Sequence, residues 1–379
     1  MKEFSKNKRG ISLIVLVITI IVMIILATAI ILSLNSSDII GKANEAKTSS
    51  DTANKKAAAS VLLAEYELAV VNGETTKTAS EYVKEGLAAQ GIDASDIAIT
   101  EDGEILVGTA ALFINNEVPI GTTVTGYKLS QAASAKTYTT SGEENTSESD
   151  PIPATITRDE SITWKYFGID ENGEALIVGS VTASSPKITL GGKGGYLNGP
   201  STLKTICETM YSSEMGTARS MDWEDVTRIL EYEGHEGTYD DADGNEIKTD
   251  KALTIGEIET KLGITLYKGV TPDESDIANF KSDNVYLPKT STDIKAGDTE
   301  KSLVYQSTAY WLASPCVTAD FEADCAIFNV RFVDSTCVNA YELLSSSDFS
   351  YCDEYAVRPV VSLSSNVQVA YDGTTVTLS

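Results

Sequence analysis

The chain has 379 residues, more than a single hydrophobic core usually serves, so at least two domains are expected. Lys and Arg number 29 against 55 Asp and Glu, which gives a formal net charge of −26. A surface this acidic repels phosphate groups, and nucleic-acid binding is therefore excluded. The single histidine, His235, excludes a histidine-rich metal site.

Residues 11–34 form an apolar run that is long enough to cross a membrane as a helix. The run carries no charge, and about 20 helical residues span the ~30 Å hydrocarbon core. Lys2, Lys6, Lys8 and Arg9 precede it, whereas the rest of the chain is acidic. Because basic residues stay on the cytoplasmic side, we expect membrane insertion through residues 11–34 and an extracellular C-terminus.

The residues in front of this run predict a particular kind of leader. An ordinary signal peptide has a small-residue cleavage site after a shorter apolar region, whereas here Lys8-Arg9-Gly10 stands directly before Ile11. From about residue 6 to 70, this layout resembles type IV pilins and type II secretion pseudopilins. The resemblance implies cleavage between Gly10 and Ile11 and a retained helix in a filament core. That family usually has Glu at the fifth mature position, where this chain has Val15, so a plain membrane anchor is the alternative.

Residues 38–71 are rich in alanine and predict a long helix that ends at Asn72-Gly73. A second, shorter helix is expected over residues 80–90. Two short apolar runs, 97–99 and 105–107, flank an Asp-Gly pair and predict a tight hairpin. A stalk helix followed by a small sheet is also the arrangement of a pilin head.

Residues 131–153 predict a linker or exposed loop. They are poor in large apolar residues, rich in Ser, Thr and Glu, and end with two prolines. Such a segment buries too little surface to offset its conformational entropy. We therefore expect a domain boundary here.

The remainder predicts a mixed domain in which helices lie between hairpins. A second hairpin is expected from strands 162–170 and 175–179 around an Asn-Gly pair. Helices are expected over 196–210, over 220–232 with a serine cap, and over 254–262. Because the chain from residue 310 onward is strand-like, the class expected is α+β.

Three segments that suggest chemistry have simpler explanations. The glycine-rich residues 190–195 lack the spacing of a phosphate-binding loop and predict a flexible turn. The carboxylates of 240–246 match a calcium loop only in part, which favours a solvated turn. His235 is interpreted as an exposed structural residue. No serine or cysteine nucleophile motif is present, so we expect no enzyme activity, no cofactor and no metal, although a hydrolase with paired carboxylates is a third alternative.

The strongest pattern lies in three C-terminal segments, Tyr310–Ser314, Phe328–Val333 and Ala356–Leu363. Within them, the large apolar side chains are expected in the core, and an arginine is expected as a partly buried ion-pair donor. These core residues are Trp311, Phe332 and Val360, and the arginine is Arg358.

Together with Gly195–Gly199 and the segment Arg219–Trp223, these motifs resemble a bacterial surface domain related to C-type lectins and formylglycine-generating enzymes. The resemblance covers Trp164 to the end of the chain. It implies ligand binding and no catalysis, since the cysteine pair that holds copper in the enzymes has no convincing match here. The calcium-dependent sugar motifs of the lectins are also missing from the sequence.

Residues 315–326 and 334–355 are filled with Ser, Cys, Asp, Tyr, Asn and Phe without clear periodicity. Tyr and Ser are the residues that adaptable recognition surfaces use. Replacement of adenines in Asn and Tyr codons also yields this set, and the segments resemble the variable proteins of diversity-generating retroelements. That resemblance would account for five cysteines of which four lie after residue 315, with one or two disulfides left open. An ordinary serine-rich loop set is the alternative.

The sequence thus predicts an α+β protein of the bacterial cell surface, with a pilin-like helix and small antiparallel sheet followed by a C-type-lectin-like domain. The expected parts are a leader (1–10), a transmembrane and stalk helix (11–72), a head (73–130), a linker (131–153) and the lectin-like domain (154–379). The expected ligand contacts are Asp320, Phe321, Asn329, Asn339, Tyr341, Phe349, Tyr351 and Tyr355.

The function expected is that of a surface-displayed adhesin or receptor-like protein with an unknown protein or glycan ligand. It would be held singly at the membrane or carried on a pilus-like filament. The alternative is a structural minor pilin or pseudopilin, whose partners would be other pilin subunits.

Overall fold

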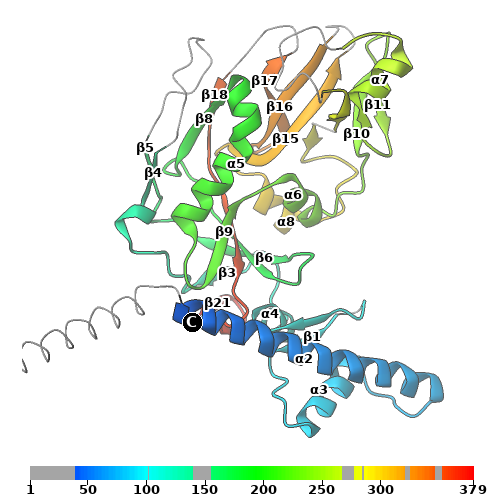
Figure 1. The fold of residues 1–379 in the computed structure, drawn as a ribbon, viewed down its shortest axis with the longest axis vertical. Coiled ribbons are helices and arrows are strands. Elements are labelled where there is room, and N and C mark those ends of the chain that lie inside the picture. The colour runs from blue at the N-terminus through cyan, green and yellow to red at the C-terminus, as the bar shows by residue number, and fades with distance from the viewer. Residues whose placement is uncertain are drawn as a thin grey trace, which may run out of the picture. The chain divides into compact units, whose positions relative to one another are not determined.

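The structure is a computed structural model that describes residues 39–100, 102–139, 155–266, 277–283, 286–320, 325–345 and 352–379 (Figure 1). The chain divides into two compact units, residues 1–92 and residues 93–379. None of the described helices is both long enough and apolar enough to cross a bilayer. The expected membrane span 11–34 and the expected cleavage site at Gly10 and Ile11 lie outside the described residues.

From residue 39 onward, where the structure describes it, the first unit contains the helices α2 (Ile39–Asn72) and α3 (Ala79–Ala89), which confirm the predicted pair. After α2 ends at Asn72, Gly73 has a φ of 71°. A capping box between Thr78 and Glu81 starts α3, because each of these residues satisfies a backbone N–H of the other. Val83 and Leu87 lie one turn apart on α3 and are fully buried.

The second unit is built around two large sheets (Figure 1). The seven-stranded sheet has the order β20-β21-β3-β6-β7-β19-β9. Its strands are β3 (Thr123–Thr125), β6 (Trp164–Ile169), β7 (Ala175–Gly179), β9 (Gly216–Ser220), β19 (Pro359–Leu363), β20 (Val369–Tyr371) and β21 (Thr375–Leu378). The pairing of β6 with β7 confirms the second predicted hairpin.

The eight-stranded sheet carries the C-terminal motifs. Its main path is β12-β13-β15-β16-β17-β14, and β18 joins β15 to β8 at one side. Its strands are β8 (Lys187–Gly191), β12 (Leu253–Thr254), β13 (Lys281–Ser282), β14 (Leu287–Pro288), β15 (Tyr310–Asp320), β16 (Cys325–Val333), β17 (Cys337–Ser345) and β18 (Cys352–Ala356).

Helices and small hairpins complete the second unit. The helices are α4 (Thr109–Asn115), α5 (Gly192–Tyr211), α6 (Trp223–Ile229), α7 (Ile255–Leu262) and α8 (Asp298–Val304), with 3-10 turns at Ala133–Ala135 and Ile277–Asn279. The hairpins pair β1 (Ile97–Ile99) with β2 (Ile105–Val107), β4 (Thr137–Thr139) with β5 (Thr155–Thr157), and β10 (Gly237–Asp240) with β11 (Glu246–Thr249). The long helix α5 packs on both large sheets, and its Leu203 and Ile206 are fully buried between them.

The structure confirms the α+β class and corrects three local expectations. The second compact unit starts at Asp93. The predicted boundary at 131–153 lies inside this unit, because β3 in front of it pairs with β6 and with the C-terminal strand β21 behind it. The glycines of 190–195 end β8 and begin α5 and are not a separate turn. The helix expected from residue 220 starts at Trp223, because Asp222 and not Ser220 caps it.

We expect Gly126→Ala to destabilise the second unit more than Gly373→Ala. Both glycines have positive φ, 83° and 92°, so each alanine costs about 1 kcal/mol of backbone strain. At Gly126 a Cβ would also lie 2.3 Å from the backbone oxygen of Leu378, whereas nothing lies within 4 Å at Gly373. Tryptophan fluorescence during thermal unfolding measures this unit alone, because all three tryptophans lie in it. Equal losses in the two variants would contradict the close approach of Gly126 to β21.

Candidate functional site

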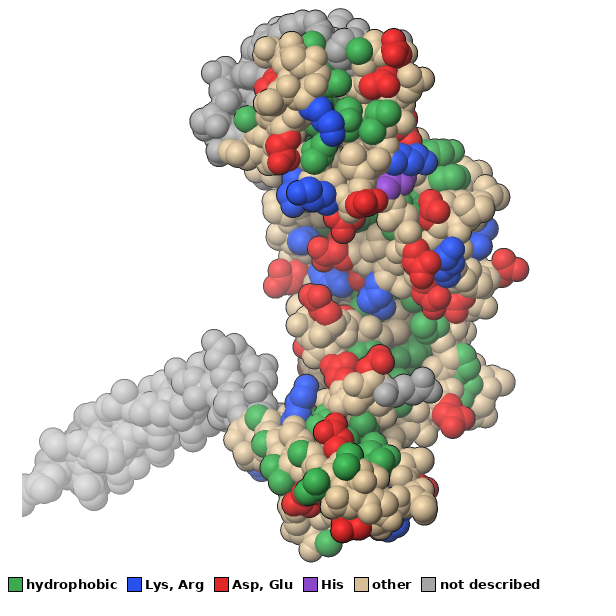
Figure 2. All heavy atoms as spheres, turned by 90° about the vertical axis from the view of Figure 1, so that its right-hand side faces the viewer, with side chains coloured by type: hydrophobic (Ala, Val, Ile, Leu, Met, Phe, Trp, Pro, Cys, Tyr) green, Lys and Arg blue, Asp and Glu red, His purple; other side chains and the backbone are tan. Residues whose placement is uncertain are grey.

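Charge alone does not mark a site on this protein. On the side shown in Figure 2, Lys and Arg side chains are interspersed with Asp and Glu, and hydrophobic side chains occur in small groups between them. The C-terminal motifs are more informative, because the strand register brings their aromatic side chains together.

The register of the eight-stranded sheet places four aromatic residues on one of its faces. Trp311 of β15 pairs with Phe332 of β16, and Phe332 pairs with Asn339 of β17. Tyr341 follows Asn339 by two residues and therefore shares its face. Ala356 of β18 pairs with Tyr310 of β15, so these two residues share one face of the sheet. Their chain neighbours Tyr355 and Trp311 therefore share the opposite face. We call Trp311, Phe332, Tyr341 and Tyr355 the aromatic face.

The rings of the aromatic face pack on one another around a buried tryptophan. Trp311 is fully buried, and its indole nitrogen donates to the Ile188 carbonyl at 3.0 Å, which ties β15 to β8. The Tyr355 ring lies 4.6 Å from Trp311, and Phe332 stacks on Tyr355 at 4.7 Å with a 20° angle between the ring planes. Tyr341 lies nearly perpendicular to Tyr355 at 6.2 Å. Contacts of this kind add stability beyond buried area and hold the rings in place.

Three of these rings are only half-buried, and a carboxylate lies beside them. Phe332, Tyr341 and Tyr355 remain partly exposed, as does Asp353, two residues before Tyr355 on the same side of β18. Burial raises the pKa of the Tyr355 hydroxyl, and the hydrogen bond and negative charge of Asp353 raise it further. Tyr355 therefore stays protonated and the region around it is electronegative.

The structure describes five of the eight expected contact residues, and it brings three of them together. Tyr341 and Tyr355 belong to the aromatic face, and Asn339 lies on the same side, with its Oδ1 accepting from the Ala340 N–H. Asn329 is only 4% exposed and donates to the Ile327 carbonyl, so its side chain is not offered to a ligand. Asp320 ends β15, and only its backbone is described. Phe321, Phe349 and Tyr351 lie outside the described residues.

Sequence reasoning missed two members of this site. Phe332 was expected in the core, as Trp311 and Val360 were; those two are fully buried, whereas Phe332 is half-exposed. Local alternation gave no signal for Phe332, because Val330, two residues away on the same face of β16, is fully buried. Asp353 gave no signal, since its position depends on the pairing of β18 with β8.

On the opposite face, Arg331 fixes β16 from behind. Its guanidinium lies 4.7 Å from the centre of the Trp223 ring, and one of its nitrogens lies 3.7 Å from an Asp283 oxygen. The same guanidinium donates to the Pro315 carbonyl at 3.2 Å. Arg331, the chain neighbour of Phe332, is thus held by Trp223 of α6, by Asp283 and by Pro315 of β15.

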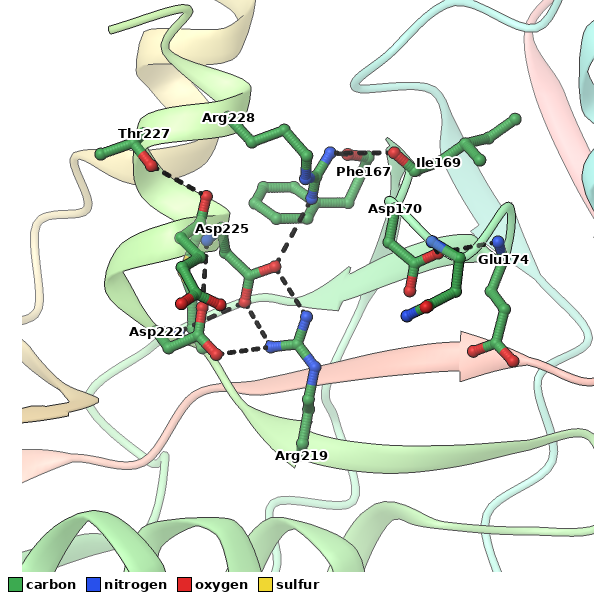
Figure 3. A network of polar contacts seen from close by, with 12 residues as sticks. Phe167, Ile169, Asp170, Glu174, Arg219, Asp222, Asp225, Thr227 and Arg228 are labelled. Carbon is green, nitrogen blue, oxygen red and sulfur yellow. Dashed lines mark hydrogen bonds and ion pairs between the residues drawn. The ribbon is translucent and has the colours of Figure 1, made fainter. Parts of the chain in front are cut away.

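An ion-pair network around the buried Asp225 carboxylate positions the helix that carries Trp223 (Figure 3). Arg219 of β9 makes two hydrogen bonds to the Asp225 carboxylate, at 2.5 and 2.8 Å. Arg228 lies 3.5 Å from the same carboxylate and donates to the Phe167 and Ile169 carbonyls of β6. Burial would raise the pKa of Asp225, but the hydrogen bonds and charge of Arg219 outweigh it, so the pKa is lowered. The network thereby joins α6 to the seven-stranded sheet.

Arg358 was expected as a partly buried ion-pair donor, and the structure corrects this. The residue is 2% exposed, and among the described residues its hydrogen bonds go to uncharged acceptors. It donates to the Gly179 carbonyl at 3.1 Å and to the Tyr310 hydroxyl at 2.8 Å. Tyr310 in turn donates to the Val304 carbonyl at 2.8 Å. Arg358 therefore links the two large sheets and is not available to a ligand.

Other candidate chemistry is structural. The Asp241 carboxylate accepts the N–H groups of Asp243 and Asn245, which makes residues 240–246 a hairpin turn as predicted. Among the described residues no group of three or more His, Cys, Asp or Glu side chains could hold a metal ion. A cavity of about 190 Å³ lies beside β7, β9 and β19 and is lined by one described carboxylate, Glu174, and by hydroxyls such as that of Thr217. This is not the paired-carboxylate pocket that a glycosidase requires.

All five cysteines are free thiols, so the structure contains none of the disulfides that the sequence left open. Cys352 is exposed and the other four are buried. Burial raises the pKa of the Cys316 thiol to about 11 and also raises that of Cys207. These thiols stay protonated at neutral pH and pack as small apolar groups.

Comparisons of the chain with protein-family models, with curated proteins and with solved structures found no match. The pilin and lectin-like resemblances therefore rest on the sequence motifs that carry them. The site is defined by its geometry, a half-exposed aromatic face on the eight-stranded sheet with the Asp353 carboxylate beside Tyr355.

We expect Asp225→Asn to lower the free energy of unfolding by about 2 kcal/mol at pH 7, because the buried carboxylate is the shared partner of Arg219 and Arg228, while solvent screens part of the charge of these half-buried arginines. The pKa of Asp225 is lowered in the folded state, so its contribution is present above the ordinary value of 3.8 and is lost as the pH falls through the folded-state pKa. The difference between wild type and variant should therefore shrink in acid. Denaturant titrations at several pH values measure it.

Glu224→Gln is the matched control for Asp225→Asn, since it removes the same charge from an exposed position of the same helical turn. It should change stability by less than about 0.5 kcal/mol. A loss in Glu224→Gln as large as in Asp225→Asn would contradict the special role of the buried pair.

Proposed function

We propose that this protein is a surface-displayed ligand-binding protein, adhesin-like or receptor-like, whose ligand contacts the aromatic face. The observation that carries the proposal is the set of half-exposed rings of Phe332, Tyr341 and Tyr355 on a buried tryptophan. Aromatic side chains of this kind dominate the energetics of protein interfaces, because they supply large contact area with little rotamer entropy to lose.

The position of the face on a sheet suits recognition. Its rings come from four neighbouring strands in the order β18, β15, β16 and β17. Arg331 holds β16 from the opposite face of the sheet, and the indole of Trp311 ties β15 to β8. Sites on rigid elements keep their geometry better than sites on loops. A ligand therefore meets a preorganised surface, which lowers the entropic cost of binding.

The proposed scaffold for this face is a C-type-lectin-like domain of the kind that diversity-generating retroelements vary. Two observations support it. The motif residues Trp311 and Arg358 are buried and link elements of the scaffold, whereas Tyr341 and Tyr355 come from the irregular stretch 334–355 and are half-exposed. Such a division lets the surface residues change without loss of the core.

The proposed anchor is the apolar segment 11–34, which would place the second unit outside a bacterial cell. A structural minor pilin or pseudopilin is the second candidate, and one observation favours it. The helix α2 exposes apolar side chains at Val61, Leu68, Val70 and Val71, the kind of surface that another helix covers in an assembly.

Replacement of rings of the aromatic face should weaken binding to a cell or glycan target without unfolding the protein. In Phe332→Ser and Tyr355→Ser we expect at least about tenfold weaker binding, the usual loss at an aromatic hot spot. Tyr286→Ser is the control, because this tyrosine is 52% exposed and does not belong to the face. Binding of the full-length chain in detergent to panels of cells and glycan arrays measures the effect, and tryptophan fluorescence checks folding. No binding to any target, with the chain recovered in filaments, would support the structural pilin instead.

The DNA around the gene offers an independent test of diversification. We expect a near-copy of the codons for residues 310–358 that differs only at adenines and lies beside a reverse transcriptase gene. Sequencing of the flanking region checks this. Absence of such a copy would leave an invariant adhesin with the same aromatic face.

A further inference from the structure

Within its own fold, the protein twice combines an arginine, an aromatic ring and an aspartate. The Arg331 guanidinium lies 4.7 Å from the Trp223 ring centre and 3.7 Å from Asp283. The second combination forms around Arg228, whose guanidinium lies 5.3 Å from the Phe167 ring centre and 3.5 Å from the Asp225 carboxylate. In each case the guanidinium lies against the electron-rich face of the ring and also forms an ion pair with the carboxylate.

The aromatic face repeats two of these three components. Tyr355 and Phe332 supply stacked rings, and Asp353 supplies a carboxylate that hydrogen-bonds Tyr355. Within the described part of the chain, the arginines donate hydrogen bonds to groups outside the aromatic face; these arginines are Arg158, Arg219, Arg228, Arg331 and Arg358. The third component of the combination would therefore come from a partner molecule.

We propose that the aromatic face receives an arginine side chain of a partner protein, with the guanidinium against the rings of Tyr355 and Phe332 and its N–H groups directed at Asp353. The proposal rests on the proposed ligand-binding function and specifies the chemistry of the ligand. Attraction between a chain with a net charge of −26 and a basic partner surface would also speed their association.

The geometry favours arginine over other cations and over a sugar. The Phe332 and Tyr355 rings stack on each other with planes 20° apart, so a planar guanidinium can lie on the outer side of this stack and fork its N–H groups to a carboxylate. A quaternary ammonium has no N–H to donate to Asp353. Lysine carries a compact, strongly hydrated charge that loses more on desolvation. A neutral sugar can stack on the rings but gains nothing from the carboxylate's charge.

The test uses four capped pentapeptides that differ only in a central residue between glycines: arginine, lysine, trimethyl-lysine or citrulline, the uncharged analogue of arginine. Saturation-transfer difference NMR with the full-length chain in detergent micelles detects the weak binding expected of a single side chain. We expect the arginine peptide to bind most tightly and the citrulline and trimethyl-lysine peptides at least about fivefold more weakly.

Variants of the full-length chain then locate the site. Asp353→Asn should weaken arginine binding about fivefold, and Tyr355→Leu should weaken it at least as much. Glu354→Gln is the matched control, because Glu354 is exposed on the opposite side of β18 and its removal changes the net charge equally. Tryptophan fluorescence on unfolding checks each variant, and Asp353→Asn is nearly isosteric, so one test does not depend on removing a ring.

Each other outcome overturns the inference in a distinguishable way. Equal losses in Asp353→Asn and Glu354→Gln would show general attraction to an acidic chain. Tighter binding of trimethyl-lysine would show a quaternary ammonium site, as for a lipid headgroup. Glycan or cell binding that depends on Tyr355, with no arginine-peptide signal, would overturn this inference and leave the proposed function standing. Failure of every target, cells included, would overturn both.

Discussion

The pairing of β15 with β16 decides which residues this protein presents and which it hides. In this register Trp311 lies opposite Phe332, and Arg331 points to the other side. Because side chains alternate along a strand, a slip of one residue would bring Arg331 to the aromatic face and turn Phe332 toward Trp223. The contacts of Arg331 with Trp223 and Pro315 are available only in the observed register, so they specify the site as well as stabilise it.

These contacts depend in turn on elements far away in the sequence. Trp223 lies on α6, and the position of α6 depends on the Asp225 carboxylate between Arg219 and Arg228. Arg358 and Tyr310 then join the sheet that contains Arg219 to the sheet that contains the aromatic face. Charged and polar groups thus fix the relation between the two sheets, and apolar side chains such as Leu203 of α5 fill the space between them.

Local signals in the sequence were enough for the elements but not for their assembly. The Asp-Gly and Asn-Gly pairs predicted their hairpins because these turns require positive φ, which Gly103 and Gly173 have. The helix ending at Asn72 and the one capped by Thr254 follow from equally local chemistry. The pairing of β3 with β21 joins residues about 250 positions apart, and no composition or periodicity reports such a partner. For this reason the serine-rich stretch 131–153 suggested a domain boundary that the contacts do not show.

The same distinction explains why the site was only partly foreseen. Tyr341 and Tyr355 stood out because Tyr in an irregular polar stretch is unlike core sequence, whereas Phe332 in an apolar run looks like any core residue. Exposure of Phe332 depends on its place in the sheet, beside a half-exposed Tyr355. Asn329 shows the converse, since a polar residue in β16 can be buried when the neighbouring Ile327 carbonyl satisfies it. Residue type indicates what a side chain can do, but strand register and the packing of α5 decide which side chains can reach a ligand.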